Sequence, residues 1–126
     1  MESYAANGSQ DLAAISTDRV ADSVVVTVDG EVDILSGPPI RRALADALDE
    51  HDGRPVVIDL TRVTLLSSTG LAVLVDAHWH AQQRGRSLVL VVDPDVHAVR
   101  LALQMAGIAT LFTIVADLQE ALRPGD

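Results

Sequence analysis

The sequence predicts one α/β domain, with a mixed central sheet of about four to five strands and about four helices. Apolar segments of strand length alternate with segments in which apolar residues recur at helical spacing, in the order β-β-α-β-α-β-α-β-α. The chain of 126 residues is long enough for one domain with a buried core. Hydrophobic residues make up 48% of it but aromatic residues only 2%, so we expect a core of aliphatic side chains.

The first strands follow a polar segment. Residues 1–10 are small and polar and are expected to form a flexible N-terminal arm, whereas residues 11–124 are expected to form the single domain. Two strands are predicted at residues 12–17 and 23–28, and the second has a valine at every other position, which places these valines on one face. The sequence DGEVD is expected to end this strand, with Gly30 in a turn.

A helix and the central strand come next. The helix is predicted within residues 36–53, where apolar residues recur three and four positions apart and Pro38 suits the first turn. Residues 56–60, VVIDL, are an unbroken apolar run, which is typical of a strand covered on both faces. In the continuation TRVTLL, Val63 and Leu65 alternate and are expected on the same face.

The second helix is predicted to begin at Ser68. Its apolar spacing places Leu71, Leu74 and Val75 on the buried face. The opposite face is then expected to be exposed, and it consists of Thr69, Val73, Asp76 and His80.

The last third of the chain continues the alternation. Residues 87–92 predict a strand, residues 93–107 a helix that ends at a glycine, and residues 111–115 a final strand. Asp117 and Glu120 resemble a capping box at the start of a last short helix.

Composition excludes several classes of partner and site. The formal net charge of −9 opposes binding to nucleic acid phosphates, and no segment approaches the roughly 20 apolar residues that cross a bilayer. The chain has no cysteine, which excludes thiol catalysis and cysteine-ligated zinc. It also begins without a secretory signal, so we expect a cytoplasmic protein whose partners are neither nucleic acid nor membrane.

The most informative feature is a group of three hydroxyls, Ser67, Ser68 and Thr69, followed by Gly70 at the start of the second helix. One serine is sufficient as a helix N-cap, a role that stabilises a helix by about 1 kcal/mol. The remaining hydroxyls allow either a nucleophile or a site of modification. A nucleophile elbow requires a glycine two residues before the serine, but Leu66 stands there, and no histidine has a spacing that suggests a catalytic triad.

The sequence also contains no motif that indicates another catalytic site or a cofactor site. His78 and His80 lie two residues apart on a predicted helix, on different sides of it, so they cannot chelate one metal ion. There is no glycine-rich phosphate loop and no convincing acid–base pair. We therefore expect no catalysis, no metal and no cofactor of the chain's own, and we consider the junction a candidate for phosphorylation by another protein.

The residues around this junction resemble the signature of the STAS domain, and specifically the bacterial anti-sigma factor antagonists. The segment VVIDLTRVTLLSSTGLAVLV is similar to the family's strand–D-S-[ST]-G-L–helix pattern, DGEVDILSGPPIRRAL to its G-E-[ILV]-D segment, and VRLALQMAGI to its third helix. The similarity covers about residues 12–122. The matching positions of the first pattern are Asp59, Leu60, Val63, Leu66, Ser68, Thr69, Gly70 and Leu71.

The resemblance implies a STAS fold and a function in partner switching. In this family the serine at the position of Ser68 is phosphorylated by an anti-sigma factor that is also a serine kinase, and a PP2C-type phosphatase reverses the modification. ATP and magnesium belong to the kinase. The unphosphorylated antagonist binds the anti-sigma factor and so releases a sigma factor. Thr69 and Ser67 are the alternative phosphorylation sites here.

The resemblance also implies the partner-binding residues. Asp33 matches a family acid near the phosphorylated serine, and the expected contact residues are Asp33, Ser67, Ser68, Thr69, Gly70, Val73 and Asp76. Two positions depart from the family pattern, because Ser67 replaces the usual aspartate and Leu65 the usual aromatic residue. The alternatives are therefore a STAS module of a transporter or sensory assembly that is not phosphorylated, or a small-molecule binder.

Overall fold

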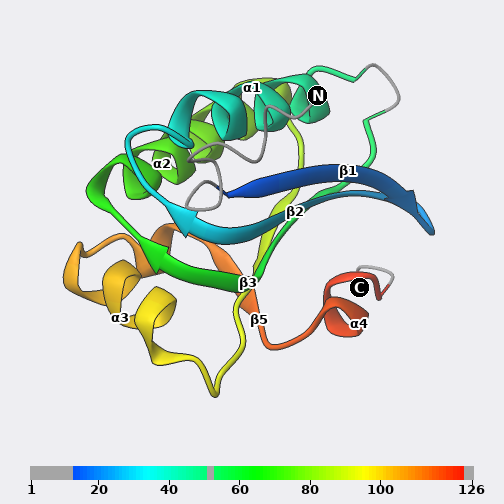
Figure 1. The fold of residues 1–126 in the computed structure, drawn as a ribbon. Helices are drawn as coiled ribbons and strands as arrows, with labels where there is room; N and C mark the ends of the chain where they lie inside the picture. The colour runs from blue at the N-terminus through cyan, green and yellow to red at the C-terminus, as the bar shows by residue number, and fades with distance from the viewer. Residues whose placement is uncertain (1–12, 51–52, 124–126) are drawn as a thin grey trace.

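A computed structural model describes residues 13–50 and 53–123 (Figure 1). In this part of the chain five strands form one sheet in the order β1-β2-β3-β4-β5; β1 and β2 are antiparallel and the later neighbours are parallel. The strands are β1 (Ala14–Val20), β2 (Ser23–Val32), β3 (Val56–Leu66), β4 (Leu88–Val91) and β5 (Thr113–Val115). The helices are α1 (Gly37–Leu48), α2 (Ser68–Arg84), α3 (His97–Met105) and α4 (Leu118–Ala121), with a 3₁₀ turn at Ala109–Leu111.

The predicted fold class is confirmed, as are the mixed sheet and the four helices. The predicted capping box at Asp117 is present in part: its carboxylate accepts the N–H of Glu120 at 2.7 Å, while the Glu120 carboxylate accepts that of Ala116. The expected N-terminal arm lies outside the described residues. No helix in the described ranges is long and apolar enough to cross a bilayer.

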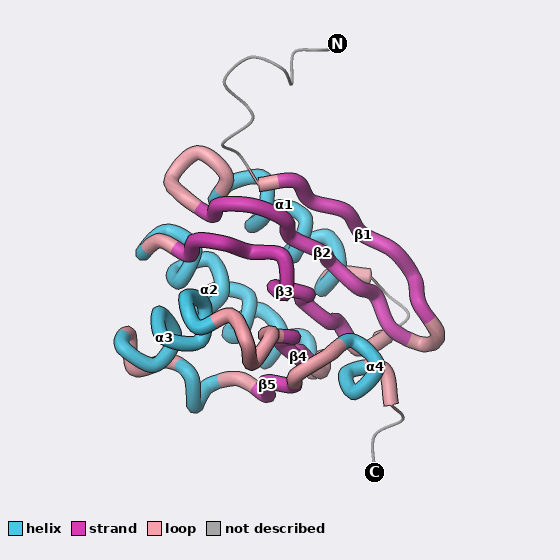
Figure 2. Tube along the Cα trace, turned by 60° about the horizontal axis from the view of Figure 1, so that its bottom comes forward, coloured by secondary structure: helices cyan, strands magenta, loops and turns pink. Residues whose placement is uncertain are grey.

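The two faces of the sheet are covered unequally. The main core contains buried aliphatic side chains from α1, α2 and α3 together with alternate residues of the strands. The opposite face carries a smaller cluster, Val25, Val57 and Val91, which packs against residues of α4. Figure 2 shows the strands side by side, with α4 at the end of the sheet where the β1–β2 turn lies. Because α4 has only four residues, part of this second face is left uncovered.

Two bulges in β3 change which of its residues point inward. Ile58 and Leu60 lie in the core as simple alternation predicts, but the next core positions are Val63 and Leu66. The pairing with β2 shifts register at both places, so each bulge inserts one extra residue in β3 and moves the inward position by one. The expectation that Leu65 shares the face of Val63 is therefore wrong, and Leu65 is 48% exposed.

Gly30 has a different role from the one expected. β2 does not end at DGEVD but continues to Val32, because β3 extends far enough to pair with it. Gly30 has a φ of 111° and lies at the second register shift, between the pairs that it and Glu31 form with β3. Its backbone freedom thus serves an irregular strand pair and not a turn.

A buried arginine joins α1 to the sheet. The side chain of Arg86, which precedes β4, donates hydrogen bonds to the carbonyl oxygens of Ala47, Leu48 and Glu50 at the end of α1 and to that of Arg54. Carbonyl oxygens at a helix C-terminus carry a partial negative charge, which compensates the guanidinium charge. The sequence pattern did not predict this contact.

Candidate functional site

The strand–helix junction after β3 is held by Ser67. Its N–H donates to the carbonyl oxygen of Val32 at 2.9 Å, which joins the junction to the end of β2. Its extended backbone makes it the N-cap of α2, and its hydroxyl accepts the N–H of Gly70 at 3.4 Å. The expected capping role of Ser67 is confirmed, and its hydroxyl is already used inside the fold.

Ser68 is the first residue of α2 and is exposed. Within the described part of the chain its side chain makes no hydrogen bond. No acidic side chain lies in the first turn of the helix, so the partial positive charge of the helix N-terminus is not neutralised by a carboxylate there. A free hydroxyl at this position is accessible to an enzyme, and an anion attached to it would lie next to unpaired backbone N–H groups.

Thr69 and Gly70 contribute to packing. A Cβ on Gly37, at the start of α1, would lie 2.7 Å from Cγ2 of Thr69, so the threonine methyl occupies that space. A Cβ on Gly70 would lie 2.6 Å from Cδ1 of Leu66 and 2.7 Å from Cγ1 of Val32. Gly70 is therefore buried because α2 approaches β2 and β3 closely here, and it leaves no backbone open to a partner, contrary to expectation.

Asp33 shapes the loop between β2 and α1. Its carboxylate accepts the N–H groups of Leu35 at 2.9 Å and Ser36 at 3.1 Å. Its own N–H donates to the Ser36 hydroxyl at 2.8 Å. These reciprocal bonds give the loop a defined shape next to the Ser67 junction, and Asp33 directly follows the residue to which Ser67 is bonded.

Sequence reasoning missed the apolar side chains around the junction. Ile34 and Leu35, in the loop that Asp33 shapes, are 74% and 68% exposed, and Leu65 at the end of β3 is 48% exposed. We call these three residues the apolar rim. The sequence feature that could have indicated them is the apolar pair Ile34–Leu35 between the predicted turn and the predicted helix, where polar residues are usual.

The exposed face predicted for α2 is wrong at Val73, which is 2% exposed. The helix is covered by the sheet and by α1, and its buried residues form one face that is rotated toward Gly70 and Val73 relative to the predicted face; they are Gly70, Val73, Leu74, Ala77 and Ala81. Val75, expected in the core, is only partly buried. Asp76 is exposed as expected, and it pairs with Arg41 of α1.

His78 and His80 contact other side chains, and neither forms a hydrogen bond with Ser68. His78 packs edge-on against Trp79 and Phe112. His80 was expected in solvent, but its Nε2 lies 2.7 Å from the carboxylate of Asp49 at the end of α1. Arg84 pairs with the same carboxylate, and the hydrogen bond from His80, followed by these charges, lowers the pKa of Asp49. Across the described ranges, no group of three or more acidic or histidine side chains is arranged to hold a metal ion.

Comparison with known proteins connects this geometry to a family. Residues 13–121 match the profile of the STAS domain. The anti-sigma-B factor antagonist of Listeria monocytogenes is 37% identical over 73 residues, which are 58% of this chain and 63% of that protein. The matched region is thus slightly less than two thirds of the curated relative.

Solved structures show the same architecture. A crystal structure of an anti-sigma factor antagonist from Mycobacterium paratuberculosis superposes with a TM-score of 0.78 at 26% identity, over 89% of this chain and 92% of that one. The Bacillus cell fate determinant SpoIIAA in its phosphorylated form superposes with a TM-score of 0.62 at 18% identity, over 86% of this chain and 96% of that one. The second likeness concerns the fold alone.

Proposed function

Because the chain belongs to the STAS domain family, we propose that it is an anti-sigma factor antagonist, which binds an anti-sigma factor and is switched off by phosphorylation of Ser68. The observation that carries the proposal is that the three hydroxyl residues at the junction differ in their contacts and exposure. Ser67 caps α2 and Thr69 packs on Gly37, whereas Ser68 is exposed. Among the three hydroxyls, Ser68 is therefore the one that a kinase reaches without opening the fold.

The binding surface that we propose is the apolar rim together with Ser68. Ile34 and Leu35 follow β2, Leu65 is the penultimate residue of β3, and the backbone bond between Ser67 and Val32 holds the two strand ends together. Burying one large aliphatic side chain stabilises a complex by about 1.5–3 kcal/mol. Asp33 belongs to this surface through the loop shape that it maintains, and Val73 does not, because it is buried.

Phosphorylation would block docking and leave the domain folded. A phosphoserine carries about −1.5 to −2 charges at neutral pH. At position 68 the dianion would lie beside the first-turn N–H groups of α2, which stabilise an anion in the free protein. A partner seated on the apolar rim would have to remove water from that charge, and this cost opposes binding.

The chain's own contribution to the chemistry is the Ser68 hydroxyl. ATP and magnesium would be bound by the anti-sigma factor acting as serine kinase, and a PP2C-type phosphatase would remove the phosphate. We propose that this exchange takes place in the cytoplasm. The chain itself would catalyse no reaction.

The experiment is a binding measurement with the cognate anti-sigma factor. Ser68→Ala should bind within threefold of wild type, and Ser68→Glu should bind more than tenfold more weakly, which is about 1.4 kcal/mol. Ser87→Glu is the matched control, because it places the same charge on an exposed serine at the other end of the sheet. Equal affinities of Ser68→Ala, Ser68→Glu and wild type would contradict the switch.

One observation favours a second candidate function, a STAS module that is not phosphorylated. The family's aspartate before the modified serine is replaced by Ser67, so the first turn of α2 lacks the carboxylate. Mass spectrometry after incubation with the kinase and ATP separates the two candidates. Phosphate on Ser68 supports the antagonist, and an unmodified chain that still binds its partner supports the module.

A further inference from the structure

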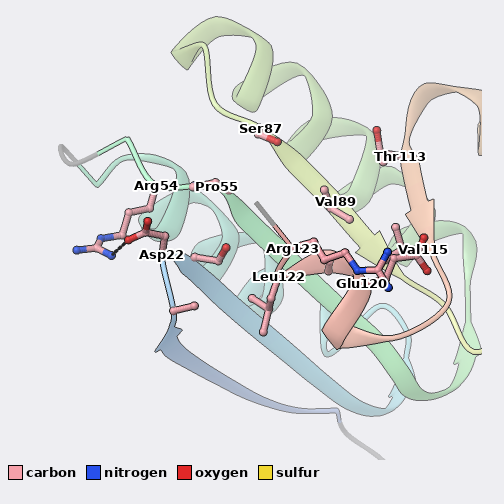
Figure 3. Close-up of a pocket in the computed structure, with 13 residues that line it drawn as sticks. Asp22, Arg54, Pro55, Ser87, Val89, Thr113, Val115, Glu120, Leu122 and Arg123 are labelled. Carbon is pink, nitrogen blue, oxygen red and sulfur yellow. Dashed lines mark hydrogen bonds and ion pairs between the residues drawn. The ribbon is translucent and has the colours of Figure 1, made fainter. Parts of the chain in front are cut away.

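A cavity of about 1150 Å³ lies at the end of the sheet opposite to Ser68 (Figure 3). It is bounded by the starts of the strands and by α4, on the face of the sheet that α4 covers incompletely. Pro55 at the cavity precedes β3 and Ser68 follows it, so the length of this strand, roughly 30 Å, separates the two sites. Cavities that hold small organic molecules are of this order of size.

The floor of the cavity is apolar. Val89 of β4, Val115 of β5 and Leu122 at the end of α4 line it, and all three are only partly buried. Figure 3 shows Val89 and Val115 on neighbouring strands, with Leu122 reaching toward the sheet from α4. The three side chains form an apolar surface that suits a hydrocarbon chain or an aromatic ring.

A buried hydroxyl in the cavity wall has no hydrogen-bond partner among the described residues. Ser23, at the start of β2, is 6% exposed, and its side chain makes no hydrogen bond within the described part of the chain. Buried polar groups are normally paired, and an unpaired one calls for a ligand or another explanation. Ala21, which also lines the cavity, has a φ of 54° because it lies in the two-residue turn that joins β1 to β2.

The charged residues that line the cavity favour a ligand with a negatively charged group. Arg54 and Arg123 line the cavity from different elements, in a chain whose net charge is −9, and Figure 3 shows the Arg54 guanidinium directed toward Asp22 and away from Val89 and Val115. Of the two acids at the cavity, Asp22 lies 3.4 Å from Arg54, and the Glu120 carboxylate accepts the backbone N–H of Ala116. Arg123 makes no ion pair with any residue that the structure describes, so its guanidinium is available to an anion.

We propose that this cavity binds a small amphipathic anion. Its apolar chain or ring would lie on Val89, Val115 and Leu122, its acidic group would contact Arg123, and the Ser23 hydroxyl would donate a hydrogen bond to it. The proposal is independent of the Ser68 switch, since the two sites lie at opposite ends of β3.

The test uses 8-anilinonaphthalene-1-sulfonate, an aromatic sulfonate that fluoresces in apolar sites, with the purified chain alone. We expect saturable binding with one site, displaced by decanoate but at least tenfold less effectively by decylamine, which has the same chain length and the opposite charge. Displacement by both probes alike, or an absence of saturable binding, would overturn the proposal.

Substitutions of residues that line the cavity test whether the probe binds there. Arg123→Glu, at an exposed helix end, and Val89→Phe, which fills the floor, should each weaken binding at least tenfold. Ser23→Ala should weaken it severalfold while leaving the melting temperature unlowered, because the hydroxyl makes no hydrogen bond to any residue that the structure describes. Arg42→Glu, an exposed arginine of α1, is the charge-matched control and should bind like wild type. If Arg42→Glu and Arg123→Glu had equal effects, net charge rather than the cavity would explain the binding.

Discussion

At the scale of single residues, four adjacent positions have four different tasks. Ser67 caps α2, Ser68 is exposed, Thr69 packs against Gly37, and Gly70 lets α2 approach the sheet. In sequence all three hydroxyls are candidates for modification, and the family resemblance favours Ser68. They differ in what surrounds each of them, and this difference also supports Ser68 as the site of modification.

Gly70→Ala tests the close approach of α2. The added methyl would meet Leu66 and Val32, which are both in the core, so we expect a loss of about 1–3 kcal/mol in the free energy of unfolding. Urea unfolding followed by the fluorescence of Trp79 measures it. The control is Ala72→Ser in the same helix at an exposed position, with a change within about 0.5 kcal/mol. An unchanged stability of Gly70→Ala would contradict the packing described above.

At the scale of elements, short loops and helix ends determine how the helices sit on the sheet. Asp33 closes the loop before α1, and Arg86 binds the carbonyl oxygens where α1 ends. Both ends of α1 are therefore tied by polar groups, and both contacts join the helix to segments next to β-strands.

Arg86→Met should destabilise the domain. The substitution keeps much of the side-chain volume but removes the charged donor that bonds to the buried carbonyl oxygens of Ala47 and Leu48, so we expect a loss of roughly 2–4 kcal/mol. Arg42→Met, on the exposed side of α1, is the matched control. Chemical denaturation of both variants measures the difference, and similar midpoints for the two would show that the buried contacts contribute little.

The loop before α1 is also where the proposed interface can be tested separately from phosphorylation. Ile34→Ser and Leu35→Ser should each weaken anti-sigma factor binding about tenfold, because an apolar side chain no longer leaves water on docking. Their stability should change by less than about 0.5 kcal/mol, since both side chains are exposed in the free protein. Leu101→Ser, an exposed leucine of α3, is the control and should bind like wild type. Full binding by all three variants would remove the loop from the interface.

At the scale of the whole molecule, the sheet separates two surfaces. One end carries Ser68 and the apolar rim, and the other carries the cavity beneath α4. The seam between α1 and α2 is crossed by ion pairs, of Arg41 with Asp76 and of Asp49 with His80 and Arg84. The stability of the domain should therefore depend on pH.

Asp49→Asn tests this dependence. The hydrogen bond from His80 and the nearby charges lower the pKa of Asp49 below its ordinary value of 3.8. A carboxyl group with a lowered folded-state pKa adds stability above the unfolded pKa, and this contribution is lost as the pH falls through the folded pKa. Wild type should thus be more stable than Asp49→Asn at neutral pH, and the difference should disappear in acid.

Unfolding measurements from pH 2.5 to 7 follow this difference. Asp46→Asn on the exposed side of α1 is the control, and its stability relative to wild type should not show the same acid-dependent loss. A constant difference between Asp49→Asn and wild type across this range would contradict the assigned role of the carboxylate.

The sequence by itself determined the fold class, the order of the elements and the junction at Ser67–Gly70, because these depend on local periodicity, capping residues and glycine. It also determined the resemblance to the family, through short motifs in order. Local signals predicted α1 and the end of α3 at Gly107 well, because proline, glycine and helical spacing act within a few residues.

Only the tertiary structure decided which side chains of those elements face water. Val73 is buried because α1 covers a second side of α2, and Leu65 is exposed because two bulges shift the alternation of β3. Arg86 is buried because a helix end lies beside it in space. These outcomes depend on segments far apart in the chain, whose positions are set by packing and pairing and carry no signal in the local pattern.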